Sequence, residues 1–253
     1  MKINPGAQLN EKILYQHYTS LYNLLKQFRK SNFINLHLEH LGEDFSLFFT
    51  NKIIYCQAKS KNKIYLYELK DILSRFLVKI REDSNVYCTL FSENYFNTKE
   101  ADRVKSIIQR LNRSTINHPK MLNEINRVIN LDFTKFEIDR IQIINISKKN
   151  LRAIILNDLH EVIDIPITHK YLEHEMYSII GKFLELASKS EKYTKVMFSK
   201  TLYDIKNKLK YSDEILDSIN TKEIAQLLVK IADILGRKNQ PTQNKSIMEI
   251  SDE

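Results

Sequence analysis

Apolar residues near the start of the chain recur at helical spacing, and the segment after them alternates strictly between apolar and polar residues. The helical positions are Leu9, Ile13, Leu14, Leu21, Leu24, Leu25 and Phe28. This periodicity predicts a helix over residues 8–30, and the alternation predicts a strand over residues 34–39. Two further short strands are expected over residues 44–50 and 53–59. Asn51 and Lys52 separate them, and Asn tolerates the positive φ that a two-residue hairpin turn requires.

The next segments continue this alternation of helices and strands. Residues 66–81 carry one apolar stripe, and residues 86–91 form an apolar run typical of a buried strand. The stripe consists of Leu69, Ile72, Leu73, Phe76, Leu77 and Ile80. Asn97 and Glu100 form a capping-box pattern, which predicts that another helix begins there. The order helix, three strands, helix, strand, helix predicts a small α/β core with a mixed sheet.

The rest of the chain is expected to be mainly helical. One more strand is predicted over residues 141–146, with Ser147 placed to cap the helix after it. The predicted helices span residues 150–159, 168–187, 193–209 and 221–235, the last ended by Gly236. From residue 237 the chain is polar and poor in large apolar side chains, which predicts a disordered tail.

The expected organisation therefore has three parts. Residues 1–115 form the core. Residues 116–236 form a mixed, then helical, extension that packs on the core or mediates assembly. Residues 237–253 form the tail.

Composition narrows the class of protein. Of the 253 residues, 43% are hydrophobic and 28% are charged, which is the balance of a folded soluble protein rather than a disordered one. No apolar run approaches the ~20 residues that span a bilayer, and the first residues lack the apolar core of a signal peptide. We therefore expect a cytoplasmic protein with no membrane partner. Cys56 and Cys88 each fall in a predicted strand, which favours reduced, buried thiols over a disulfide or a metal site.

The net charge of +8 is spread unevenly along the chain. Residues 1–150 hold 24 Lys and Arg against 15 Asp and Glu, whereas residues 151–253 hold 15 against 16. A polyanion such as DNA is the natural partner of the basic part, through contacts to its phosphates. Many Lys-rich proteins are nevertheless basic without binding nucleic acid, so the charge alone does not show that this chain binds DNA.

The predicted hairpin brings three polar side chains to one face of the sheet. With the turn at residues 51–52, Asp44 lies opposite Lys59, and Ser46 lies opposite Gln57. Side chains alternate along a strand, so Gln57 and Lys59 share one face with their cross-strand partners. An acid, an amide and an ammonium group therefore converge on one patch.

That patch suits the hydrolysis of a phosphodiester. Asp44 offers a hard oxygen ligand for Mg²⁺, and the side-chain oxygen of Gln57 and the backbone carbonyl of Ala58 can complete the protein's share of the shell. Such a metal polarises the scissile phosphate and lowers the pKa of a bound water. Lys59 can orient that water or stabilise charge on the phosphorane. Gln57 in place of a glutamate removes one negative charge, so we expect a weaker site that also tolerates Mn²⁺.

An acid followed across a hairpin by [E/Q]-x-Lys, after an amphipathic helix, resembles the PD-(D/E)xK restriction-endonuclease-like fold. More narrowly, residues 5–115 resemble the double-stranded-DNA nuclease domain of bacterial anti-phage effectors, including those of CBASS, Lamassu and HerA-associated systems. The residues that carry the likeness are Tyr15-Gln16, Glu39, Glu43-Asp44 and Gln57-Ala58-Lys59.

This resemblance implies a restriction-endonuclease-like α/β core whose mixed sheet is flanked by helices, with catalytic roles for Asp44, Gln57 and Lys59. Glu39 is then a second acidic catalytic group, and Gln16 borders the site. The implied activity is Mg²⁺-dependent hydrolysis of double-stranded DNA by the effector subunit of an anti-phage system. Activation by other subunits of a defence complex or by homo-oligomerisation is expected. The rival interpretation is a catalytically silent interaction or DNA-binding subunit of a defence or repair complex.

Two other groups of residues offer weaker chemistry. His37 and His40 flank Glu39, but a zinc site needs further ligands that converge on it. A predicted helix carries several cations that form either a solvated face or contacts to a DNA backbone. These cations are Arg103, Lys105, Arg110 and Arg113.

Overall fold

The computed structural model describes residues 5–60, 63–93, 96, 98–114, 118–165 and 169–210. The chain divides into a first unit, Met1–Ile205, and a second unit, Lys206–Glu253. The second unit is described only over residues 206–210, which are helical. Among the residues so described, no helix has the length and apolar character needed to cross a membrane.

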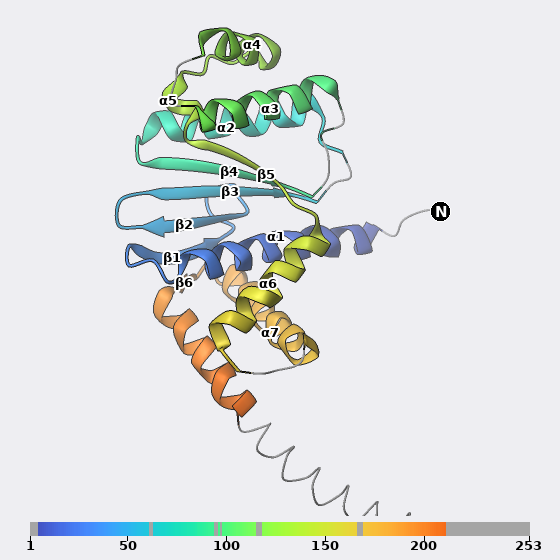
Figure 1. The fold of residues 1–253 in the computed structure, drawn as a ribbon, viewed down its shortest axis with the longest axis vertical. Helices are drawn as coiled ribbons and strands as arrows, with labels where there is room; N and C mark the ends of the chain where they lie inside the picture. The colour runs from blue at the N-terminus through green and yellow to red at the C-terminus, as the bar shows by residue number, and fades with distance from the viewer. Residues whose placement is uncertain are drawn as a thin grey trace, which may run out of the picture. The chain divides into compact units, whose positions relative to one another are not determined.

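Six strands of the first unit form one mixed sheet in the order β5-β4-β3-β2-β1-β6 (Figure 1). Strands β1, β2 and β3 form an antiparallel meander, whereas β3, β4 and β5 run parallel. The short β6 pairs antiparallel with β1 at one edge. The strands are β1 (Phe33–Leu38), β2 (Phe45–Phe49), β3 (Ile53–Lys59), β4 (Val86–Ser92), β5 (Ile141–Asn145) and β6 (Lys192–Thr194).

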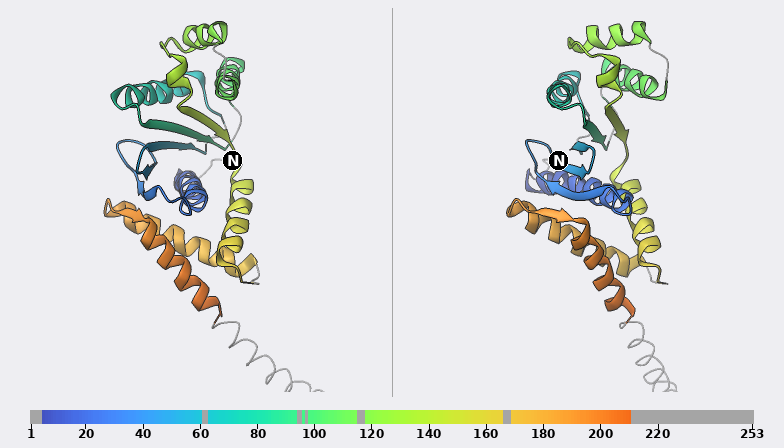
Figure 2. Two further views of the ribbon diagram at one scale, coloured as in Figure 1. Left: turned by 60° about the vertical axis from the view of Figure 1, so that its left-hand side comes forward. Right: turned by 90° about the vertical axis from the view of Figure 1, so that its left-hand side faces the viewer.

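Helices cover both faces of this sheet. The named helices are α1 (Pro5–Gln27), α2 (Leu66–Glu82), α3 (Lys99–Arg113), α4 (Pro119–Ile129), α5 (Lys135–Ile138), α6 (Lys148–Ile163) and α7 (His169–Ser188). Helices α2 and α3 lie on one side of the sheet and α1 on the other (Figure 2), and α6 and α7 pack against α1. The predicted fold class, an α/β core with a mixed sheet flanked by helices and a helical extension, is confirmed.

The core follows from the periodicities of the sequence. The predicted apolar stripe of α2 is buried at every position. Alternation along β4 turns Val86, Cys88 and Leu90 towards α2 and α3, where they join one apolar cluster. The residues between them, such as Tyr87, face the other side. Cys56 and Cys88 are both buried free thiols, as predicted.

Two helices begin later than predicted, and a threonine side chain accepts a hydrogen bond at the start of each. Helix α3 begins one residue later than expected, because the side chain of Thr98 accepts a hydrogen bond from the Ala101 amide. The predicted helix over residues 193–209 is wrong at its start. Thr194 ends β6 and accepts from the Met197 amide at 3.2 Å, and the helix covers residues 195–210. The predicted capping role of Ser147 in α6 is confirmed. Helices α4 and α5 were not individually predicted.

The predicted turn of the β2–β3 hairpin is wrong by one position. The amide of Phe49 donates to the carbonyl of Lys52 at 2.9 Å, so the turn consists of Thr50 and Asn51. The ammonium of Lys52 lies over the Phe49 ring, 5.3 Å from its centroid. Lys52 therefore lies beside β2 rather than in the turn.

Moving the turn by one position shifts the register by two residues. Asp44 lies opposite Gln57 rather than Lys59, and Ser46 pairs with Tyr55 rather than with Gln57. A shift of two leaves every side chain on its predicted face, because side chains alternate with a period of two. The convergence of the polar patch therefore survives the incorrect register.

The proposed division at residues 115 and 236 stays a prediction. Strands β5 and β6, which lie beyond residue 115, belong to the same sheet as β1–β4. The predicted helix over residues 221–235 and the predicted tail over residues 237–253 lie outside the described residues.

The core analysis predicts the effect of truncating one buried side chain of α2. Leu73 is 0% exposed, whereas Val78 on the same helix is 53% exposed. We expect Leu73→Ala to lower the free energy of unfolding by about 2–5 kcal/mol, because it leaves a cavity in the cluster beneath α2. Urea denaturation measures this change. Val78→Ala is the control, and an equal loss in both variants would contradict the assignment of Leu73 to the core.

Candidate functional site

The loop between β1 and β2 presents two acidic side chains at one end of the sheet. Its backbone turns sharply because Glu39, Leu41 and Gly42 all have positive φ, with Gly42 at 78°. The amide of Glu39 donates to the carbonyl of Asp44 at 2.8 Å and closes the loop. Glu43 and Asp44 are thereby placed beside the end of β3.

Three N–H groups surround the carboxylate of Asp44. One oxygen, Oδ2, accepts from the backbone amide of Ala58 at 2.5 Å and from the side-chain amide of Gln57. The other, Oδ1, accepts from the side-chain amide of Gln16 on α1. The predicted group of Asp44, Gln57 and Ala58 is thus brought together, with Gln16 at its border.

Strand β2 begins only at Phe45, which explains why the Ala58 amide is free to donate to the Asp44 carboxylate. The carbonyl of Cys56 accepts from the Asp44 amide at 3.1 Å, so Cys56 uses its backbone groups on the β2 side. Backbone groups alternate along a strand, which places the N–H and C=O of Ala58 on the same side, beyond the first residue of β2. There they meet a side chain instead of a neighbouring strand.

Two cations of α2 hold the acidic loop. Arg75 donates to the Gly42 carbonyl at 3.3 Å, and Lys79, one turn later, donates to the Leu41 carbonyl at 3.1 Å. Arg75 also contacts the Glu43 carboxylate at 3.4 Å and the side-chain oxygen of Gln57 at 3.2 Å. The orientation of the Gln57 amide follows from its neighbours, because its oxygen faces a donor and its nitrogen faces an acceptor.

Burial dominates the electrostatics of both acids. Burial raises the pKa of Asp44, although the Ala58 N–H and the charge of Lys59 lower it. Burial likewise raises the pKa of Glu43 against the opposing charges of Arg75 and Lys79. Glu43 is 3% exposed, and its Oε2 has no hydrogen-bond partner among the described residues. The site therefore favours a nearby cation over further negative charge.

The remaining predicted residues take different positions. Lys59 is half-buried at the end of β3, and its charge acts on both Asp44 and Glu43. Glu39 is exposed, and its backbone amide takes part in the contacts of the loop. The Tyr15 hydroxyl donates to the Ile146 carbonyl at 3.0 Å, so this side chain ties α1 to the segment after β5.

Two residues near the site were not singled out from the sequence. Arg75 occupies a polar position of an amphipathic helix, where sequence alone indicates only solvent exposure. Glu93 directly follows β4; its amide donates to the Lys59 carbonyl at 3.0 Å, and its carboxylate accepts from the Lys148 amide at 3.3 Å. Parallel strands end at the same edge of a sheet, and this rule could have identified Glu93.

The side-chain oxygens of Asp44 and Gln57, which could hold a metal ion here, already accept hydrogen bonds. Among the described residues there is no group of three or more His, Cys, Asp or Glu side chains that could hold a metal, His37 and His40 included. A metal here would therefore rely on Asp44, the Ala58 carbonyl and the Gln57 amide oxygen. Because that oxygen faces Arg75, the amide of Gln57 would have to rotate to bind the ion.

Comparison with known proteins gives structural relatives but no sequence relatives. No family model matches the chain, and no curated protein matches it either. Similar solved structures include the SAVED/CARF-domain containing receptor Cap4 of Acinetobacter baumannii with the cyclic trinucleotide 3'3'3'-cAAA, at 18% identity and a TM-score of 0.58. That likeness covers 77% of this chain and 45% of the receptor.

A second similar structure is the Cap4 receptor of Moraxella osloensis, at 14% identity and a TM-score of 0.55, covering 79% of this chain and 48% of that one. At these identities the likeness shows a shared fold. The chain spans less than half the length of both receptors.

The burial of Glu43 predicts a pH-dependent gain in stability for Glu43→Gln. A raised folded-state pKa means that the glutamate's contribution is fully present below its unfolded pKa and is lost as pH rises through the folded value. We therefore expect Glu43→Gln to melt at a higher temperature than the wild type at pH 8. The difference should shrink as pH falls towards about 4.3, the ordinary glutamate pKa. Thermal melts across this range measure it.

Glu39→Gln is the matched control, since Glu39 is an exposed glutamate of the same loop. Its melting temperature should follow the wild type at each pH. A destabilised Glu43→Gln variant at pH 8 would mean that the pair with Arg75 outweighs the cost of burial.

Proposed function

We propose that this chain is a metal-dependent endonuclease of the PD-(D/E)xK type that hydrolyses double-stranded DNA. The observation that carries the proposal is the contact of the Asp44 carboxylate with Gln57 and Ala58 at the end of β3, within the field of the Lys59 charge. An acid, a [E/Q]-x-Lys segment and the order of elements around them are the pattern of that nuclease class. The excess of positive charge in residues 1–150 suits a DNA substrate.

Asp44, Gln57 and the Ala58 carbonyl would hold Mg²⁺, and Mn²⁺ should be tolerated. When bound, the ion supplies charge neutralisation at the scissile phosphate and a water of lowered pKa. The protein's part is to orient the Asp44 carboxylate and to offset the burial that raises its pKa. The Ala58 N–H, the amides of Gln16 and Gln57 and the charge of Lys59 all favour the ionised form.

Lys59 has a separate role in the proposal. Lys59 ends β3, and its charge lowers the pKa of Asp44. In the proposal, its ammonium group orients the attacking water or stabilises negative charge on the phosphorane. Arg75 would keep the Gln57 amide in place while no ion is bound, through its contact to the amide oxygen. Glu39 is exposed at the loop and would contribute as a second acid only through substrate or water.

The biological setting proposed is bacterial anti-phage defence, with this chain as an effector subunit. Two observations support it: the resemblance in residues 5–115 and the shared fold with part of the Cap4 receptors. The proposed trigger is association with partner subunits or homo-oligomerisation, as the resemblance implies. The second candidate function is a catalytically silent DNA-binding or interaction subunit. The exposed position of Glu39 and the absence of a multi-acid cluster among the described residues favour it.

Substitution of Lys59 separates the two candidates. We expect Lys59→Ala to lower the rate of plasmid cleavage by about 10²–10³, because a charge-stabilising group is lost from the transition state. Asp44→Ala should be equally inactive for lack of a metal ligand. Both rates are measured with Mg²⁺ and with Mn²⁺, alongside thermal melts that verify folding.

Lys200→Ala is the control, since Lys200 is an exposed lysine in the helix of residues 195–210. Full activity of Lys59→Ala would contradict the catalytic assignment. A wild type that cleaves under no condition, including with its partner subunits, would favour the silent subunit.

The charge distribution predicts salt-dependent binding to DNA. Each phosphate contact releases counterions, so affinity for a labelled duplex should fall about 10³-fold between 50 and 200 mM salt if about six phosphates are contacted. Fluorescence anisotropy in EDTA measures this without cleavage. An affinity that salt does not change would argue against DNA as the substrate.

A further inference from the structure

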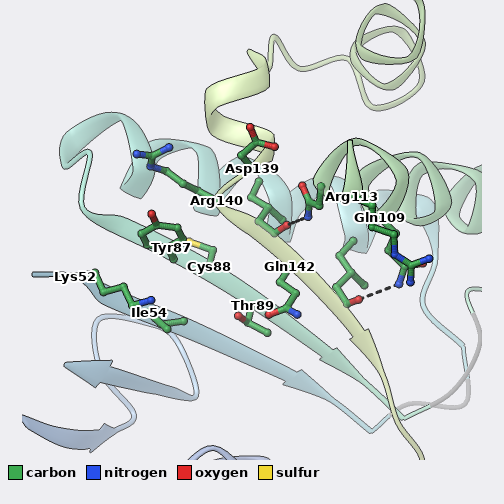
Figure 3. Close-up of a pocket in the computed structure, with 13 residues that line it drawn as sticks. Lys52, Ile54, Tyr87, Cys88, Thr89, Gln109, Arg113, Asp139, Arg140 and Gln142 are labelled. Atoms are coloured by element: carbon green, nitrogen blue, oxygen red, sulfur yellow. Dashed lines mark hydrogen bonds between the residues drawn. The ribbon is translucent and has the colours of Figure 1, made fainter. Parts of the chain in front are cut away.

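A groove of about 510 Å³ lies along the amino-terminal halves of β3, β4 and β5 (Figure 3). Strand residues Ile54, Tyr87, Thr89 and Gln142 line it, together with residues of α3 and of the segment before β5. Its volume falls within the roughly 300–1,000 Å³ typical of small-ligand sites. Its lining is polar rather than apolar.

This part of the sheet is polar because of strand alternation. In β5, Ile141 and Ile143 join the apolar cluster under α2 and α3, while Gln142 between them is exposed. Side chains of α3 also close the edge of β5: Asn112 donates to the Ile141 carbonyl at 2.6 Å, and Gln109 to the Ile143 carbonyl at 3.1 Å. These carbonyls of the β5 edge are therefore not free to pair with a further strand.

Three cations surround the groove without acidic partners. Lys52, Arg113 and Arg140 all line it, and none of them forms an ion pair among the described residues. The acid in the lining, Asp139, is already paired with Lys135. The groove thus carries uncompensated positive charge on a concave surface, where an anion is favoured.

Aromatic contacts hold two of these cations over the sheet. Lys52 lies 5.1 Å and Arg140 5.4 Å from the centroid of the Tyr87 ring. Arg140 is fixed further by donating to the backbone carbonyls of Ser84 at 3.0 Å and Phe136 at 3.1 Å. Arg113 is exposed on α3 at the other side of the groove. Preorganised cations of this kind bind a phosphate at a lower entropic cost than free side chains.

We propose that this groove is a second binding site, for the phosphate of a nucleotide-sized ligand, with Lys52, Arg113 and Arg140 as its phosphate contacts. The amide and hydroxyl groups of Gln142 and Thr89 on its floor offer polar partners to the rest of the ligand. The shared chemistry is a phosphate beside a polar organic group. A free nucleotide and a short oligonucleotide both provide it.

This site is distinct from the candidate nuclease site. Both sites use residues of β3: Ile54 lines the groove, and Lys59 belongs to the candidate nuclease site. At the rise per residue of a strand, these two positions are about 16 Å apart. Alternation also places Gln57 and Lys59 on the opposite face from Ile54. Occupancy of the groove therefore requires neither a metal at Asp44 nor cleavage of DNA.

Calorimetric titration of the full chain in EDTA tests the proposal, with ATP in one arm and the tetranucleotide dT4 in the other. We expect at least one probe to bind, and the Lys52→Gln/Arg113→Gln double variant to weaken that binding by about tenfold or more through loss of charged hydrogen bonds. Lys200→Gln removes one exposed charge elsewhere and should leave the Kd unchanged. Thermal melts establish that each variant folds.

The two arms identify the source of the phosphate. Binding of ATP alone assigns a free nucleotide, and tighter binding of dT4 assigns a phosphodiester. Lys59→Ala should bind the preferred probe like the wild type even if it has lost cleavage, so the groove and the nuclease proposal fail separately. No binding at millimolar probe, or binding that the double variant leaves unchanged, would overturn the proposal. So would binding that Lys59→Ala weakens.

Discussion

The carboxylate of Asp44 is the point on which the arrangement of the candidate site depends. It accepts hydrogen bonds from α1 through Gln16, and from β3 through Gln57 and Ala58. Elements far apart in the sequence therefore meet at one acid. Burying a carboxylate costs free energy unless hydrogen-bond donors or a cation surround it. The need of Asp44 for such partners therefore constrains where Gln16, Gln57 and Ala58 can lie.

Helix α2 connects this arrangement to the apolar core. Its apolar stripe is buried against the sheet. On its polar side, Arg75 and Lys79 donate to backbone carbonyls of the β1–β2 loop. The same helix therefore anchors itself in the core and fixes the backbone that presents Asp44. Arg75 also contacts Gln57, which joins the loop and the strand in one hydrogen-bond network. A group that binds a loop backbone, an acid and an amide at once acts on the geometry of all three.

The sequence was informative where the period of side chains decides the outcome. The apolar stripe of α2 and the shared face of Gln57 and Lys59 depend on periodicity alone, and the error in the hairpin turn left those faces unchanged because the shift was two residues. Contacts between distant elements carry no such local signal. In the sequence, Arg75 looks like any exposed cation on a helix, because its contact with the β1–β2 loop is a tertiary one. Strand β6 was missed because three residues give no period, and its pairing with β1 is a tertiary effect.

The parallel pairing of β3, β4 and β5 separates two chemical environments. At the carboxyl end of β3, burial raises the pKa of Asp44 and Glu43, and the charge of Lys59 lowers both. At the amino-terminal halves, Lys52, Arg113 and Arg140 line a polar groove and form no ion pair with any residue that the structure describes. Because alternate residues of one strand face opposite sides, β3 contributes Ile54 to the groove and Gln57 to the acidic site with no conflict between their packing requirements. One short strand therefore contributes to both proposed sites, the metal site and the phosphate site, each on its own face of the sheet.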